Sequence, residues 1–442
     1  MIIRLPHFYH VILFIVFAGI CSCKSGSVNL FKPSSPHEQY LRKLQNAGID
    51  QTAMGKAWLT ASQLSIENAH PINLPFRETG YFSSEKTPAV AFKFKATKGQ
   101  KLSITLNKKT AVPNTIYLDL WQLTAENTTK LVASADTLGN PVAVEINNTG
   151  EYLIRLQPEL LSSVEYTIDI VAGPSLSFPT RTGRNQIKSY YGDGRDENRR
   201  KHEGIDIFGT FRSPVIAASN GMVNRVNENN LGGKVVWLRP EGKDYTLYYA
   251  HLDQQIATEG QIVSVGDTLG LMGNTGNAKT TPTHLHFGIY APSGAVDPLP
   301  FLAPAVYPAN IAVSTGNLNK TLRTKNSAKL YSSPETNATV VRSLPASTIL
   351  TASAATANWY RVDLPDGKSG FVKGTELTTV SNPLRKITVN TEQTFLYDKP
   401  EPTALVKLTL KTGERINLLG NFEQYQLVES GDSETGWMLK LR

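Results

Sequence analysis

Hydrophobic and polar residues alternate along the chain from about residue 80 to residue 171. Apolar positions two residues apart are typical of strands that are buried on one face only. Several such segments at short spacing predict an antiparallel β-sandwich. The clearest runs cover residues 90–94, 102–106, 142–146 and 164–170.

A longer period, close to that of an α-helix, precedes the sandwich at residues 51–68. Five apolar residues fall on one face of such a helix: Met54, Ala57, Trp58, Ala61 and Leu64. This stripe predicts a helix that buries that face against the next domain. Residues 51–173 are therefore expected to form a helix plus a β-sandwich, which ends at a segment rich in Pro, Ser and Thr.

The last part of the chain repeats itself with an offset of 66 residues. Matching pairs include Leu330 with Leu396, Tyr331 with Tyr397, Pro334 with Pro400, and Phe371 with Trp437. One register held over apolar and turn positions predicts two small β-barrels, at residues 315–380 and 382–442. Their motifs resemble bacterial SH3-like domains, a family that often binds cell-wall peptides. The alternative is that these aromatic residues form only the barrel core.

The N-terminus has the pattern of an export signal. Arg4 precedes an apolar run at residues 11–20, about half of the ~20 residues that a spanning helix needs. Ser22 before Cys23 resembles a lipoprotein signal-peptidase site. This resemblance predicts a signal peptide at residues 1–22, lipidation of Cys23 and a tether at 23–50. A plain secretory signal is the alternative.

Composition excludes some classes of protein and some kinds of metal site. Hydrophobic residues make up 40% and charged residues 19% of the chain, which excludes a largely disordered chain or a polytopic membrane protein. The net charge is +8, but no basic helix or aromatic platform motif accompanies it, so nucleic-acid binding is not expected. Both cysteines, Cys21 and Cys23, lie in the leader. A later transition-metal site must therefore use histidine and carboxylate ligands.

Four of the six histidines beyond the leader fall between residues 202 and 286. The other two, His37 and His70, are expected to be ordinary residues. His284 and His286 lie two residues apart in an apolar segment, so a strand would place both on one face. Burying two imidazoles there is costly unless they have partners.

The remaining members of the cluster also suit a metal site. His202 and Asp206 flank Gly204, where a bend would let both side chains turn toward one ion. His251 lies at the end of another predicted strand. Three histidine or carboxylate ligands leave one position of a zinc ion open for water, as in catalytic zinc sites. The cluster therefore predicts a zinc hydrolase.

Four motifs in this region resemble those of the lysostaphin-type (LytM-like) zinc endopeptidases, which cut peptide bonds in peptidoglycan. The motifs are His202-x-Gly204-x-Asp206, the strand at 249–252, the turn at 270–276, and His284-Leu285-His286. The resemblance covers residues 185–302. It implies an antiparallel-β metallopeptidase domain, for which we expect the bounds 174–310.

The same resemblance assigns roles to the clustered residues. His202, Asp206 and His286 would hold one zinc ion per chain. His251 and His284 would be the catalytic histidines, which activate water and stabilise the oxyanion.

Two further positions carry expectations of their own. Gly288 stands where many relatives have an acidic residue, and we expect it to point away from the ligand face. Three arginines lie in or near the loop at residues 190–196: Arg195, Arg199 and Arg200. We expect them either to steer an acidic stem peptide or to lie in a solvated loop.

Taken together, the sequence predicts a mainly β, exported zinc metallopeptidase that hydrolyses peptide bonds of peptidoglycan stem peptides or cross-links. SH3-like modules would target it to the cell wall, and a lipid would anchor it to a membrane of the cell envelope, facing the periplasm or the cell exterior. Cell-wall or division proteins are further candidate partners. The alternative is a non-catalytic murein-binding scaffold or a regulator of another cell-wall hydrolase. A third reading is a latent enzyme whose groove is covered by the N-terminal domain.

Overall fold

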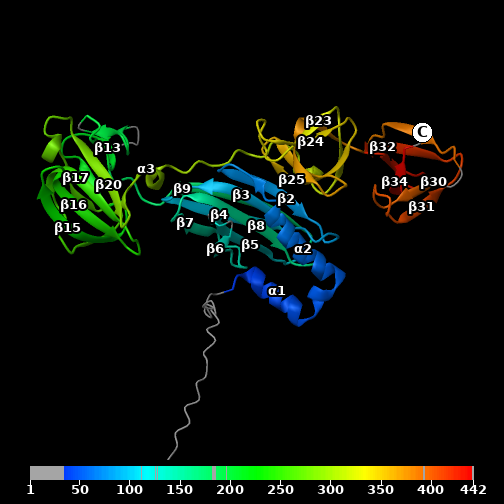
Figure 1. Cartoon of the computed structure of the whole chain (residues 1–442), viewed down its shortest axis with the longest axis horizontal. Coiled ribbons are helices and arrows are strands. Elements are labelled where there is room, and N and C mark those ends of the chain that lie inside the picture. The colour runs from blue at the N-terminus through cyan, green and yellow to red at the C-terminus, as the bar shows by residue number, and fades with distance from the viewer. Residues whose placement is uncertain are drawn as a thin grey trace, which may run out of the picture. The chain divides into compact units, whose positions relative to one another are not determined.

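The computed structural model describes residues 34–440, apart from 111, 125, 127, 182–185, 196 and 392–393. The described residues from Ser35 onward belong to one compact unit. The fold is mainly β, with few helices, as the sequence predicts (Figure 1). The predicted signal peptide and Cys23 lie outside the described residues. Within the described part of the chain, no helix has the length and apolarity needed to cross a membrane.

Helix α1 (Pro36–Asn46) lies inside the predicted tether, so the prediction of a tether at 23–50 is wrong over these residues. The Ser35 hydroxyl accepts a hydrogen bond from the backbone N–H of Glu38, and the Glu38 carboxylate accepts one from the N–H of Ser35. This reciprocal capping box satisfies backbone donors that a helix start leaves open. Two side chains of the helix are buried: His37 and Leu44.

Helix α2 (Ala53–Glu67) confirms the predicted helix, but its buried face matches the predicted stripe only at Trp58. Met54 and Leu64 of the predicted stripe are 42% and 48% exposed. Gly55 and Ser62, which the stripe did not include, are buried together with Trp58. Polar contacts set this face, because the Trp58 indole N–H donates to the carbonyl of Pro158 and the Ser62 hydroxyl accepts from Arg155.

The predicted β-sandwich is confirmed as two groups of strands that share one apolar core. One sheet has the order β1 (His70–Pro71), β3 (Val90–Ala96), β8 (Gly150–Pro158), β5 (Ile116–Leu123) and β6 (Thr129–Ser134). The other group has the order β2 (Phe76–Phe82), β9 (Val164–Pro174), β4 (Gln100–Lys109) and β7 (Val142–Glu145). The alternating residues of each run fill the core, as in β9, where Val164, Tyr166, Ile168 and Ile170 are buried.

The next domain is built on a ten-stranded antiparallel sheet. Its main path is β10 (Ile187–Ser189), β13 (Ile205–Phe208), β20 (His284–Ala291), β17 (Thr246–Gln255), β16 (Gly233–Pro240), β15 (Gly221–Asn229) and β18 (Ile262–Val263). Off this path lie β14 (Pro214–Ile216), β19 (Thr268–Met272) and β21 (Gly294–Val296). Alternate residues of the central strands form the core: Ile205, Ile207, Leu285, Phe287 and Ile289. Their neighbours in sequence are left for the opposite face.

The C-terminal part contains two barrels whose strand pairings largely correspond. The first runs through β22 (Thr321–Thr324), β23 (Ala328–Tyr331), β24 (Val340–Leu344), β25 (Ile349–Thr356), β26 (Trp359–Asp363), β27 (Ser369–Lys373) and β28 (Leu377–Thr379). The second runs through β29 (Arg385–Thr388), β30 (Thr394–Tyr397), β31 (Val406–Leu410), β32 (Arg415–Phe422), β33 (Tyr425–Glu429) and β34 (Thr435–Leu439). The pairing of β22 with β28 in the first barrel has no counterpart among the described strands of the second.

The register of these barrels repeats with the offset found in the sequence. In the first, Ala328 pairs with Leu344 and Tyr331 with Phe371. In the second, the residues 66 positions later form the same pairs: Thr394 with Leu410 and Tyr397 with Trp437. The internal repeat is therefore confirmed as a structural repeat. Several of its aromatic residues are buried, among them Tyr360, Phe371 and Trp437.

The first barrel continues the β2-containing sheet of the sandwich through the pairing of β2 with β25. Beside this pairing, Nε and Nη2 of Arg361 donate to the two oxygens of the buried Glu78 carboxylate, at 3.1 Å each. The Tyr166 hydroxyl donates to the same carboxylate at 2.7 Å. Nothing in the local sequence pattern predicts this continuity, because the paired strands lie far apart in the chain.

Candidate functional site

Three adjacent strands carry the predicted site residues to one face of their sheet. Strand β13 pairs with β20, which places Asp206 opposite His286 and Phe208 opposite His284. On the other side of β20, Ala250 of β17 lies opposite His286. The apolar residues that alternate with these positions are in the core, so the predicted same-face placement of His284 and His286 is confirmed.

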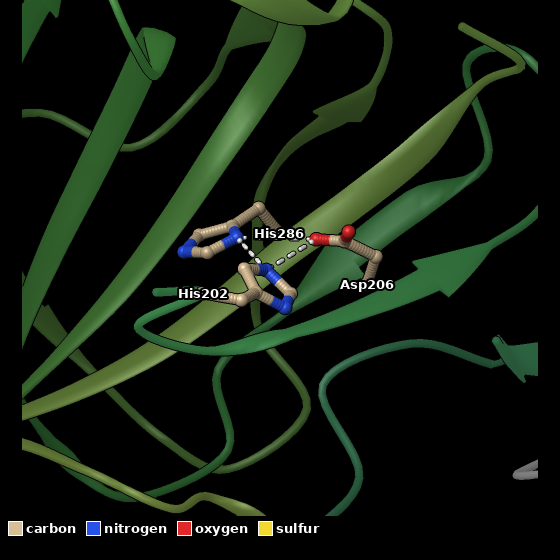
Figure 2. Close-up of side chains that lie close together, drawn as sticks. All are labelled: His202, Asp206 and His286. Carbon is tan, nitrogen blue, oxygen red and sulfur yellow. Dashed lines mark hydrogen bonds and ion pairs between the residues drawn. The ribbon is translucent and has the colours of Figure 1, made fainter. Parts of the chain in front are cut away.

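His202, Asp206 and His286 converge on one another (Figure 2). The Nε2 atom of His202 lies 2.9 Å from Nδ1 of His286. The Oδ1 atom of Asp206 lies 3.0 Å from that Nε2 and 3.1 Å from that Nδ1. His202 is 3% and Asp206 8% exposed, so these polar atoms meet with little access to water.

Backbone carbonyls fix the orientation of three histidine rings. The Nδ1 atoms of His202, His251 and His284 lie 2.8 to 2.9 Å from the carbonyl oxygens of Tyr190, Thr275 and Pro282, in that order. A carbonyl oxygen only accepts hydrogen bonds, so each Nδ1 carries the proton. In the neutral rings the lone pair is then on Nε2, the atom that is left for the site.

His251 is held in an unusual backbone conformation. Its φ is 64°, in the left-handed region that residues with a side chain seldom occupy. The pairing of β16 with β17 shifts its register next to this point, and the His251 N–H donates to the carbonyl of Gly232 at 2.8 Å. Such strain persists where the surrounding structure over-determines it, as at functional sites.

The two remaining histidines complete the cluster. Nε2 of His284 lies 4.0 Å from Oδ1 of Asp206. The His251 ring centre lies 4.9 Å from that of His284 and 5.9 Å from that of His286. The structure therefore brings together all five residues that the sequence singled out in this domain.

Burial and neighbouring charges shift the pKa values of the site. Burial, together with charge on His284 and His286, lowers the pKa of His251 to about 4. Burial also lowers the pKa of His286, against the opposing effect of Asp206. Burial alone would raise the pKa of Asp206, but hydrogen bonds and charge from His202 and His286 outweigh it and hold that pKa below its usual range.

Arg195 contributes to the site in a way that the sequence did not reveal. It lies in the short strand β11 (Gly194–Arg195), and its Nη2 donates to Oδ2 of Asp206 at 2.9 Å. Of the two readings left open for this arginine, steering a distant peptide or lying in a solvated loop, neither describes this contact. Arg195 binds one oxygen of Asp206 and leaves the other directed at the histidines.

The expectation for Gly288 is wrong. It lies two residues after His286, so the alternation of β20 places it on the same face as the histidines. A Cβ at this position would lie 3.0 Å from Cε2 of Tyr290 and 3.6 Å from Cβ of Tyr248. The glycine therefore leaves room for an aromatic group next to His286.

Two aromatic neighbours of the histidines were missed in the sequence. Tyr248 packs edge-on against His286, with ring centres 5.9 Å apart. Phe208 stacks on His284, with ring centres 5.0 Å apart. Both could have been found from the period of two, since Phe208 follows Asp206 by two residues and lies opposite His284.

The atoms that His202, Asp206 and His286 direct at one another suit the binding of a cation. Nε2 of His202 already has its lone pair free, while Nδ1 of His286 and Oδ1 of Asp206 point at the same space (Figure 2). Two imidazole nitrogens and one carboxylate oxygen are a common ligand set for zinc. The partners at the far side of each ligand, the Tyr190 carbonyl and Arg195, are the kind of support that metal ligands have.

Comparison with protein families agrees with this geometry. The model of Peptidase family M23 matches residues 200–298, which include all five residues of the cluster. Residues 200–298 are therefore similar to M23 peptidases, and the domain that contains them is called the M23 domain below. The model of the bacterial SH3 domain matches residues 326–378, the first of the two barrels. The prediction of a lysostaphin-type peptidase domain followed by an SH3-like domain is confirmed.

Known relatives resemble the chain around the M23 domain. The L-Ala--D-Glu endopeptidase of Bacillus subtilis (strain 168) is 36% identical over 137 residues, which cover 28% of this chain and 41% of that protein. An uncharacterized lipoprotein of Escherichia coli (strain K12) is 35% identical over 104 residues, 23% of this chain and 40% of that protein. The chain thus spans less than half of the length of these relatives. The solved catalytic domain of lysostaphin from Staphylococcus simulans is 30% identical, with 26% of this chain and 92% of that one covered and a TM-score of 0.25.

Proposed function

We propose that this protein is an exported zinc metallopeptidase that hydrolyses peptide bonds of peptidoglycan stem peptides or cross-links. The observation that carries the proposal is the convergence of His202 Nε2, Asp206 Oδ1 and His286 Nδ1 next to two further histidines. The M23 family match supports a peptidase, and the B. subtilis relative is named for a peptide bond between L-Ala and D-Glu.

His202, Asp206 and His286 would hold the zinc ion. Bound zinc polarises a substrate carbonyl and lowers the pKa of a bound water toward 7. Arg195 keeps the Asp206 carboxylate oriented by binding its second oxygen. The Tyr190 carbonyl keeps the His202 ring oriented so that Nε2 faces the site.

His251 and His284 would move protons. Each ring donates its Nδ1–H to a backbone carbonyl, so Nε2 is the atom that can accept a proton from the attacking water. Once protonated, the same Nε2 can donate a hydrogen bond to the developing oxyanion or pass the proton to the leaving amine. Because both rings are fixed through Nδ1, they need no rearrangement between these steps.

The remaining modules would bring the peptidase to its substrate. The SH3-like barrels would hold the protein on the cell wall, where tethering raises the effective substrate concentration. Lipidation of Cys23 would anchor the chain to a membrane of the cell envelope. A relative of the M23 domain that is named a lipoprotein supports this part of the proposal.

The decisive test is digestion of purified peptidoglycan by the full-length protein, with product analysis by mass spectrometry. We expect cleaved peptides from the wild type and none from His286→Ala. A matched control is His37→Gln, which changes a buried histidine outside the cluster and should cleave as the wild type does. Peptidoglycan binding without cleavage by the wild type would favour the non-catalytic scaffold.

A further inference from the structure

A pocket of about 620 Å³ opens beside the histidine cluster, at the β10 side of the sheet. Its lining comes from β10, the end of β13 and the residues that lead into β20: Gln186, Lys188, Phe208, Gly209, Thr210, Pro282 and Thr283. The last of these residues directly precedes His284. The pocket therefore begins where the cluster ends.

A row of three side chains connects the pocket to the cluster. The Lys188 ammonium lies 5.9 Å from the centre of the Phe208 ring. Phe208 in turn stacks on His284 at 5.0 Å, with 26° between the ring planes. The three residues come from β10, β13 and β20, which are consecutive in the sheet. A group bound against Phe208 would thus lie between the Lys188 ammonium and His284.

The lining has the chemistry of an anion site. Lys188 is its one charged residue, and the hydroxyls of Thr210 and Thr283 and the amide of Gln186 add neutral donors. Lys188 is exposed, and among the residues that the structure describes no carboxylate forms an ion pair with it. Its charge is therefore available to a ligand.

The opposite side of the cluster is lined by aromatic side chains. Beyond His286 the same sheet face carries the aromatic group of Tyr248, Trp237 and Tyr290, with ring centres 4.3 to 5.8 Å apart. The Tyr290 hydroxyl of this group donates a hydrogen bond to the Glu203 carboxylate. A charged substrate group would meet a cation on the Lys188 side and an aromatic floor with a nearby carboxylate on the other.

We propose that Lys188 is a specificity residue that binds a carboxylate of the substrate peptide next to the bond that is cut. This inference rests on the proposed peptidase function and adds the substrate class, namely peptides with an acidic residue at that position. The Thr210 and Thr283 hydroxyls would donate to the same carboxylate, and Phe208 would pack against the methylene groups of the acidic residue.

The test uses two stem peptides that differ only in charge. One carries free carboxylates on its second and third residues, and in the other both are amidated. For the full-length wild type we expect kcat/KM to be about three- to tenfold higher for the free carboxylates, mainly through KM, with a preference that shrinks as salt is added. Lys188→Met should make the two peptides equal, Lys188→Arg should keep the preference, and Lys188→Glu should reverse it.

Arg239→Met is the matched control. Arg239 is an exposed cation of β16, separated from β10 by three strands of the same sheet, so this variant should keep the wild-type preference. Equal kcat/KM for both peptides in the wild type, or a preference that Lys188→Met leaves intact, would overturn the proposal for Lys188.

A binding measurement distinguishes failure of the proposed peptidase function from failure of the proposed carboxylate site at Lys188. If the wild type cleaves neither peptide, calorimetric titration of both peptides decides the carboxylate site separately. Tighter binding of the free carboxylates, lost in Lys188→Met, would support the site even though the proposed function had failed. Equal binding of the two peptides would overturn it.

Discussion

In the described part of the chain, two clusters bury histidine together with aspartate, and one of the two suits a metal ion. In the M23 domain these are His202, Asp206 and His286. In the sandwich, His37 and Asp119 are both buried, at 5% and 2% exposure. Residue type and burial do not separate the two clusters, so the difference lies in which atoms face each other.

In the sandwich cluster each side chain meets a complementary one. The Arg155 guanidinium donates to Oδ2 of Asp119 at 2.6 Å, and the Ser134 hydroxyl donates to Oδ1 at 2.7 Å. Nε2 of His37 lies 2.7 Å from the side-chain oxygen of Gln157. Here the charge of the carboxylate is neutralised by a guanidinium, and no group of acceptors is left pointing at one space.

In the M23 cluster the acceptors point at one another. Nε2 of His202 faces both Nδ1 of His286 and Oδ1 of Asp206 within about 3 Å. Arg195 reaches only the other oxygen of Asp206. Buried acceptors that meet in this way need a proton or a cation between them. The comparison teaches that the direction of the lone pairs, more than the residue types, distinguishes the cluster that suits a metal ion.

The largest expected effect is the loss of activity when the M23 cluster is opened. Asp206→Ala removes one acceptor and should reduce peptidoglycan cleavage to background, because both the metal and the polarised water depend on this carboxylate. Product analysis of digested peptidoglycan measures it. Asp169→Ala is a control outside both clusters, since Asp169 forms a half-exposed pair with Arg77, and it should leave cleavage unchanged. Cleavage by Asp206→Ala at the wild-type rate would contradict the assignment.

The second effect separates the proposed catalytic histidines from the proposed metal ligands. His251→Ala should lower kcat by about 10² to 10⁴ because it removes a proton acceptor, while bound zinc stays at the wild-type level. Steady-state kinetics and metal analysis of the same sample measure both. Loss of zinc together with activity would show that His251 is a ligand.

The third effect concerns the sandwich cluster. Arg155→Met leaves the Asp119 carboxylate buried and unpaired, and should lower the free energy of unfolding by about 3 to 5 kcal/mol. Urea denaturation measures this loss. Arg77→Met is the matched control, because the Arg77–Asp169 pair is partly exposed and should be worth about 1 kcal/mol or less. Equal losses in the two variants would mean that burial of the Asp119 pair does not matter.

The smallest effect is a pH dependence of stability from His37. Burial, aided by the charge of Arg155, lowers the pKa of His37 to about 4. In the unfolded chain His37 takes up a proton near pH 6.5, whereas in the folded protein it does so only near pH 4. The free energy of unfolding that neutral His37 contributes is therefore fully present above about pH 6.5 and falls as the pH drops toward 4. At pH 5 the wild type should lose about 2 kcal/mol relative to its stability at pH 7. The charged and titratable groups that act on or contact the ring are Arg155, Asp119 and Tyr117.

His37→Gln isolates this contribution, since glutamine does not titrate. Denaturation curves of wild type and variant at pH 5 and pH 7 give the difference. If the two proteins lose the same stability between these pH values, His37 is not the titrating group.

Local pattern was sufficient to predict most of the fold. The period of two in residues 90–94 and 164–170 reflects strand geometry, which depends on neighbouring residues. The offset of 66 residues was found because each barrel carries the same local pattern. The buried face of α2 was predicted correctly at Trp58 but not at Ser62, because Ser62 is held by Arg155, which lies 93 residues away. Contacts at such separation leave no trace in a local period.

The candidate site was predicted in the same uneven way. The five residues of the cluster were found because histidine spacing and motifs are local and specific. Arg195 was not assigned to Asp206, because β11 lies in a loop whose path the sequence does not define. The helix α1 could have been found, since the Ser35–Glu38 capping box is a signal that can be read directly from the sequence.

The central claim is that the buried acceptors of the M23 cluster hold zinc, and metal analysis of the purified full-length protein tests it most directly. After saturation with zinc and removal of the excess, the account predicts one zinc ion per wild-type chain, none in His286→Ala, and one in His37→Gln. Wild-type protein without zinc, or zinc retained in His286→Ala, would contradict it.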